Sequence, residues 1–168
     1  MSSRTLLASI VFGLIAIAVQ PMSAAATPSL AGSWQFTLTP TAPPTPPAVE
    51  IPGLATFTTD GSVIETDGSE FAPIPVSTAT PIRPSTPGHG IWQLANTPIT
   101  LYVQYISLLL NADGSLFGRN ITTMFVTLNS KGNQFSGTYT TDQVVGSVTT
   151  VVSSGTVSGQ LIPHVPLP

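Results

Sequence analysis

The chain has 168 residues, of which 4 are lysine or arginine, 7 are aspartate or glutamate and none is cysteine, so its formal net charge is −3. Nucleic acids and anionic lipid headgroups require clustered lysine and arginine, and this composition excludes such a surface. The lack of cysteine excludes a disulfide framework and thiolate chemistry.

Residues 1–26 have the pattern of a secretory signal peptide. Arg4 precedes the uncharged apolar run Leu6–Val19, and small residues follow. The run is shorter than the roughly 20 residues that a membrane-spanning helix needs, and cleavage after Ala25 or Ala26 fits the small-x-small rule. We expect a protein secreted to the periplasm or the medium, with no stable membrane insertion after cleavage. An uncleaved anchor is the alternative.

Residues 27–162 are predicted to form one all-β domain, and residues 163–168 a disordered tail. In the first strand Trp34, Phe36 and Leu38 alternate with polar residues, which is the period-two pattern of a half-buried strand. Similar patterns, separated by turn signals, continue along the chain. The predicted strands are Ser33–Thr39, Gly53–Thr59, Ser62–Thr66, Gly90–Leu94, Ile99–Leu110, Ser115–Leu128, Gln134–Thr141 and one within Val148–Ile162.

The triplet Asp-Gly-Ser occurs three times, beginning at Asp60, Asp67 and Asp113. Glycine tolerates positive φ, and the aspartate side chain can accept a hydrogen bond from the backbone of the turn. All three triplets are therefore predicted to form hairpin turns. A calcium loop would need several oxygen ligands at regular short spacing, which these triplets lack. We therefore expect no metal and no cofactor.

Two proline-rich segments interrupt the strand pattern. Pro40–Pro47 carries five prolines and is predicted to be irregular, and Asp67–Gly88 is predicted to be a long loop. Eight antiparallel strands with mostly short turns predict an up-and-down barrel. In this meander both segments lie at the same end, so Pro40–Glu50 and Asp67–Gly88 are predicted to be lids over a mouth where a ligand would enter.

Two short motifs suggest a family. Gly32-Ser33-Trp34 resembles the G-x-W start of lipocalins and other calycins. The phrase Pro87–Trp92, with Asp113-Gly114 and Gly118 downstream, resembles a group of small exported bacterial proteins with lipocalin-like barrels and no assigned role. The chain departs from lipocalins because no arginine on a late strand can stack on the tryptophan, and no C-terminal helix follows. An allene-oxide-cyclase-like barrel is the competing shape.

No residue is assigned a catalytic role, and the candidates for ligand binding are spread along the chain. His89 is either a general base at the mouth or a turn residue. Arg119 and Asn120 lie on opposite strand faces; we favour an outward Arg119, because an unpaired buried charge is costly. The tentative binding residues are Trp34, Phe36, Glu70, His89, Trp92, Arg119, Asn120 and Tyr139.

Near the second lid Glu65, Asp67 and Glu70 form an acidic cluster that could pair with His89 or Arg83 or remain solvated. The predicted fifth strand is apolar on both faces, so its outer face is expected to be covered by a loop or by a second subunit, which would make a homo-oligomer.

Three functions remain open, with enzymatic activity the less favoured reading. The first is an exported barrel that binds a small apolar molecule. The second is a cyclase- or isomerase-type enzyme using His89 and Glu70. The third is a filled structural or self-associating domain, since small barrels are more often filled than hollow. An outer-membrane barrel is less favoured, because the first four strands are too short for roughly ten-residue spans.

Overall fold

The computed structural model describes residues 28–42, 50–70, 85–95 and 100–163. The predicted signal peptide, most of both predicted lids and nearly all of the predicted tail lie outside these residues.

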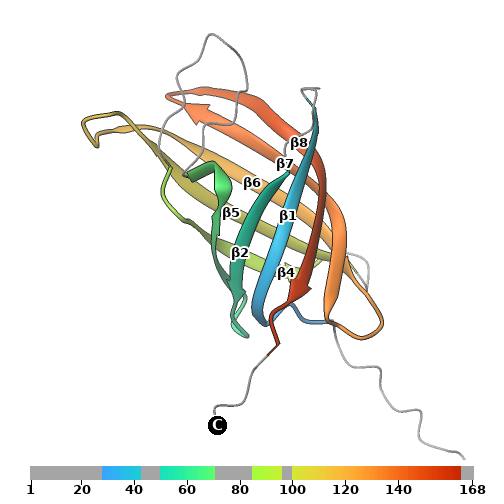
Figure 1. Ribbon diagram of the computed structural model, residues 1–168. Helices are drawn as coiled ribbons and strands as arrows, with labels where there is room; N and C mark the ends of the chain where they lie inside the picture. The colour runs from blue at the N-terminus through green and yellow to red at the C-terminus, as the bar shows by residue number, and fades with distance from the viewer. Residues whose placement is uncertain (1–27, 43–49, 71–84, 96–99, 164–168) are drawn as a thin grey trace, which may run out of the picture.

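The described chain is all-β and forms one closed, eight-stranded antiparallel barrel in which each strand pairs with its neighbours in sequence and β8 closes on β1 (Figure 1). No α-helix occurs in the described ranges, and a single 3-10 turn, η1 (Gly68–Glu70), follows β3. The strands are β1 (Gly32–Ala42), β2 (Ile51–Phe57), β3 (Ser62–Asp67), β4 (Gly88–Leu94), β5 (Thr100–Leu110), β6 (Leu116–Leu128), β7 (Gln134–Val145) and β8 (Val148–Leu161).

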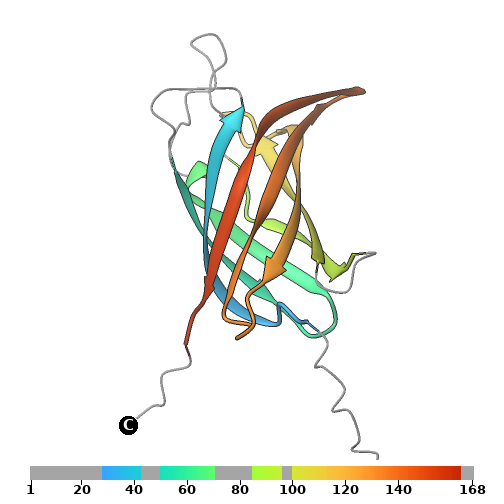
Figure 2. The ribbon, with the colours of Figure 1, turned by 90° about the vertical axis from the view of Figure 1, so that its right-hand side faces the viewer.

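The barrel has two different ends. The strand ends joined by connections β1–β2, β3–β4, β5–β6 and β7–β8 lie together, and we call this the mouth end. The turns β2–β3 and β6–β7 and both ends of the described chain lie at the opposite end, which we call the floor end (Figures 1 and 2). The strands tilt strongly, so β5 and β6 cross behind β1 and β2 (Figure 1). The predicted grouping of the connections is therefore confirmed.

Alternation decides which side chains enter the barrel. Along β1, Trp34, Phe36 and Leu38 are buried while Ser33 and Gln35 are exposed, as the sequence predicts. Burial of the apolar set drives closure of the sheet, and closure leaves no unpaired edge.

The floor half of the interior is packed with large apolar side chains. The Trp34 ring lies 5.1 Å from that of Phe135, and its indole Nε1 donates a 2.7 Å hydrogen bond to the carbonyl of the buried Leu30, which precedes β1. We call these buried residues the floor core: Leu30, Trp34, Phe57, Leu101, Val103, Met124, Val126, Phe135 and Val157.

Two of the three Asp-Gly-Ser triplets are hairpin turns, and the third is not. The Asp60 and Asp113 carboxylates accept backbone hydrogen bonds from the serines two residues on, at 3.1 Å and 3.0 Å, and Gly61 and Gly114 have positive φ. The prediction for Asp67 is wrong: Asp67 ends β3 and leads into η1, and its amide donates to Glu70 Oε1 at 3.3 Å.

Several strands are longer than predicted. Pro40 lies within β1, which continues to Ala42, and the pairing with β8 shifts register between these two residues. Proline is tolerated beside such an irregularity because it lacks only one ladder donor. The predicted seventh strand, Gln134–Thr141, extends to Val145 through a register shift after Thr141. The alternation of inward and outward residues is interrupted at a bulge, so a strand predicted from alternation alone ends before the real strand does.

Candidate functional site

The mouth half of the interior is polar, unlike the floor half. It is built from inward residues of β3, β5, β6, β7 and β8, most of them buried. Gly88 and Ser107 are inward residues of this half, whereas the floor core holds tryptophan and phenylalanine. We call the polar residues the mouth cluster: Glu65, Tyr105, Asn120, Thr122, Tyr139, Thr141 and Ser153.

A row of hydroxyl groups crosses four adjacent strands of the mouth half. Tyr105, Thr122, Thr141 and Ser153 are successive cross-strand partners on β5, β6, β7 and β8. Thr122 and Thr141 share a 3.0 Å hydrogen bond, and the hydroxyl of Tyr139 shares one of 2.8 Å with Ser153. These bonds satisfy most of the row internally, as buried polar groups require.

Glu65 and Tyr105 lie together against Gly88. A Cβ atom added to Gly88 would lie 2.4 Å from Glu65 Oε1 and 2.6 Å from Tyr105 Cδ2. The missing side chain at position 88 thus leaves the space in which the carboxyl and the phenol ring meet. The strand pairing is consistent with this contact, because Glu65 on β3 is the direct cross-strand partner of Gly88 on β4.

The carboxyl of Glu65 is held in its neutral form. Burial, followed by the negative charges of Asp67 and Glu70, raises its pKa from the usual 4.5 to about 9, and a hydrogen bond with the Gly88 backbone offsets part of this rise. At neutral pH Glu65 is therefore a carboxylic acid with one O–H to donate.

The neighbouring phenol is also neutral and strongly desolvated. Burial, followed by the charges of Glu65 and Asp67, raises the pKa of Tyr105 well above 10. The nearby Thr122 hydroxyl offsets part of this rise, but that hydroxyl is hydrogen-bonded to Thr141. Burial likewise raises the pKa of Tyr139, which its bond to Ser153 partly offsets.

Three buried polar atoms of the mouth cluster have no hydrogen-bond partner within the described residues: Glu65 Oε2, Tyr105 Oη and Asn120 Oδ1. Leaving such an atom unsatisfied costs about 1–3 kcal/mol. Buried polar atoms in proteins nearly always have a hydrogen-bond partner, so these three atoms mark the mouth cluster as the candidate site.

The opposite wall of the mouth half is apolar. Leu38 of β1 pairs with Ile51 of β2, and both are buried; the Phe36 ring covers Gly53, where an added Cβ would approach it to 2.3 Å. The polar wall also contains one buried apolar side chain, Leu109 of β5. The mouth half thus has a polar wall of β3 and β5–β8 and an apolar wall of β1 and β2.

Four of the predicted binding residues lie in the interior, at different levels. Asn120 and Tyr139 belong to the mouth cluster. Phe36 belongs to the apolar wall, and Trp34 is fixed in the floor core by its ring contact and its indole hydrogen bond.

The other four lie outside the mouth half of the interior, and of these only Trp92 packs against the buried core. His89 and Arg119 are exposed on the outer face, Arg119 as the sequence predicts. Trp92 is half-buried near the floor end, where its indole donates a 2.8 Å hydrogen bond to the carbonyl of Thr58. Glu70 lies at the mouth end, in η1.

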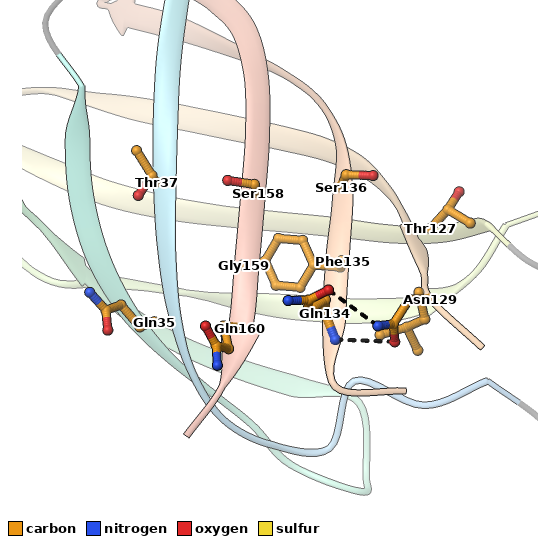
Figure 3. Close-up of a pocket in the computed structure, with 11 residues that line it drawn as sticks. Gln35, Thr37, Thr127, Asn129, Gln134, Phe135, Ser136, Ser158, Gly159 and Gln160 are labelled. Atoms are coloured by element: carbon orange, nitrogen blue, oxygen red, sulfur yellow. Dashed lines mark hydrogen bonds between the residues drawn. The ribbon is translucent and has the colours of Figure 1, made fainter. Parts of the chain in front are cut away.

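A polar hollow of about 610 Å³ lies on the outer face, near the floor end (Figure 3). Gln35, Gln160 and Gln134 form one cross-strand row in it, and threonine and serine residues form the next. Its side chains are mostly exposed and thus hydrated, and none of the unpartnered buried atoms lines it. The hollow is therefore a solvated sheet face rather than a built site.

The outer face of β5 is apolar and uncovered by the described residues. Ile106 and Leu108 are 39% and 42% exposed, and Ile106 belongs to a cross-strand row with His89 and Ile64, which is 53% exposed. The loop cover expected from the sequence is not provided by the described part of the chain, and the homo-oligomer stays a prediction.

Sequence reasoning identified Glu65 only as part of an acidic cluster, named Thr122 only as a neighbour of an inward Asn120, and missed Tyr105, Thr141 and Ser153. One signal was available for Glu65, because it shares a strand face with Val63, which is buried. The neighbouring Ile64 is equally apolar, so alternation alone did not decide which face of β3 points inward.

No group of three or more histidine, aspartate or glutamate side chains within the described ranges is arranged to hold a metal ion. The same ranges hold no helix that is long and apolar enough to cross a membrane. No protein-family model, no curated protein and no solved structure matches the chain.

Proposed function

We propose that the protein is an exported, lipocalin-like barrel that binds a small, largely apolar and uncharged molecule in the mouth half of its interior. The signal-peptide pattern of residues 1–26 supports export, and the G-x-W motif at Trp34 supports the lipocalin-like assignment. The observation that carries the proposal is the set of three buried, unpartnered polar atoms in the mouth cluster.

The two walls of the mouth half match such a ligand. Leu38 and Ile51 offer apolar contact, and Glu65 and Tyr105 offer hydrogen bonds. Ligand sites of this composition, apolar with a few fixed polar groups, are the common form in proteins.

Native mass spectrometry of the protein purified gently from its own host tests this function. We expect a reproducible non-covalent adduct. Gly88→Ala should reduce the adduct, because the added Cβ would displace the Glu65 carboxyl and the Tyr105 ring. Ile106→Gln on the outer face is the matched control and should retain it.

A clean mass without adduct, after challenge with a lipid and metabolite extract, would contradict binding and favour a filled structural domain. An adduct lost in Ile106→Gln but retained in Gly88→Ala would place the ligand on the outer face instead.

A cyclase- or isomerase-type enzyme is the second candidate, favoured by the proton that Glu65 retains at neutral pH. A carboxylic acid with a raised pKa beside a bound molecule is suited to general acid catalysis. Incubating the recovered ligand with wild type and with Glu65→Gln separates the two functions. Chemical change with wild type alone supports an enzyme, and no change with either supports a binding protein.

A further inference from the structure

We infer that the mouth cluster recognises a carbonyl oxygen, so that the ligand is an uncharged ester or ketone with an apolar body rather than a carboxylate. This inference rests on the proposed function and specifies its ligand class. Glu65 and Tyr105 are the two residues that would donate to the oxygen.

Both donors are built into the wall of the barrel. Glu65 and Tyr105 are only 4% and 3% exposed, and both pack against Gly88. Glu65 Oε2 and Tyr105 Oη have no partner within the described residues. The two side chains are neighbours at Gly88, and each offers an O–H group. A carbonyl oxygen has two lone pairs and no proton, so it is complementary to two such donors.

The charges around the donors disfavour an anion. Asp67 and Glu70 are the acidic groups nearest Glu65, from β3 and η1, and the phenols of Tyr105 and Tyr139 face the same interior from β5 and β7. The described basic residues Arg119 and Lys131 are exposed and outside the interior. Among the described residues, none of the basic side chains lies beside Glu65 and Tyr105, where it could balance the charge of a bound carboxylate.

Three probes of similar length test the inference: methyl octanoate, octanoate and nonane. Binding to the purified protein at neutral pH is followed by NMR chemical-shift titration. We expect methyl octanoate to bind at least about tenfold more tightly than either other probe, the factor that one buried hydrogen bond provides.

Tyr105→Phe should weaken the binding of methyl octanoate by about tenfold and leave the binding of nonane unchanged. Tyr102→Phe is the matched control, since Tyr102 lies on the same strand but points to the outer face, where its ring meets that of Phe125. The control should bind all three probes as wild type does.

A second variant keeps the test decisive if Tyr105→Phe does not fold. In wild type, binding of methyl octanoate should weaken as the pH approaches about 9 and Glu65 ionises, whereas Glu65→Gln, which keeps a donor, should bind it independently of pH. The same pH dependence in both proteins would overturn the role of Glu65.

The outcomes separate this inference from the proposed function. Equal binding of methyl octanoate and nonane, or tighter binding of octanoate, would overturn the carbonyl assignment while ligand binding stands. Failure of all three probes to bind would overturn both.

Discussion

The two halves of the barrel interior are built on opposite principles. In the floor core the polar Nε1 atom of Trp34 is satisfied by Leu30, and large rings fill the space. In the mouth cluster Glu65 and Tyr105 keep buried polar atoms without partners among the described residues. Stability alone would favour the first arrangement throughout, since unsatisfied buried groups cost free energy. The difference is what we expect if the floor core stabilises the barrel and the mouth cluster serves the proposed ligand binding.

The largest expected effect is in the floor core. Trp34→Ala removes a fully buried ring and the hydrogen bond to Leu30, and should lower the free energy of unfolding by about 3–5 kcal/mol. Chemical denaturation followed by circular dichroism measures this. A loss below about 1 kcal/mol would show that the floor is not the stabilising half.

The next largest effect is a pH dependence of the free energy of unfolding, which we expect to arise from Glu65 in the mouth cluster. The folded state holds the Glu65 proton more tightly than the unfolded chain, because the pKa rises from 4.5 to about 9 on folding. This stabilisation is complete below the unfolded pKa and is lost as pH rises toward 9, by up to about 1.4 kcal/mol per pH unit. Glu65→Gln should remove this slope from denaturation curves recorded at several pH values; an unchanged slope would contradict the assignment.

A smaller effect compares two tyrosines of the mouth cluster. Tyr105→Phe deletes a buried hydroxyl without a partner and should stabilise the free protein by up to about 1 kcal/mol. Tyr139→Phe deletes the bond to Ser153 and should destabilise it by a similar amount. Denaturation midpoints of the two variants measure the contrast, and a destabilised Tyr105→Phe would indicate that its hydroxyl is already satisfied.

The smallest effect is expected on the outer face. Arg119→Ala and His89→Ala change exposed side chains and should alter the free energy of unfolding by no more than about 0.5 kcal/mol. Both variants should also retain the adduct that we expect in native mass spectrometry. Loss of that adduct in His89→Ala would indicate that His89 takes part in ligand binding.

The fold was largely predictable because its signals are local. Alternation around Trp34 and the turns at Asp60 and Asp113 depend on neighbours in sequence, and the structure confirms them. The site was not predictable in the same way. Glu65 and Tyr105 lie on different strands, and they meet only because Gly88 between them has no side chain. A cross-strand arrangement of this kind depends on register, which the sequence pattern does not specify.

The central claim is that the mouth cluster, and not the floor core, holds the ligand. Intermolecular NOE measurements on the labelled protein with its co-purified ligand, or with methyl octanoate if none co-purifies, test it most directly. The account predicts contacts from Leu38, Ile51 and Tyr105. Contacts confined to Phe135 and Val126, or to the outer rows of glutamine and threonine, would contradict it.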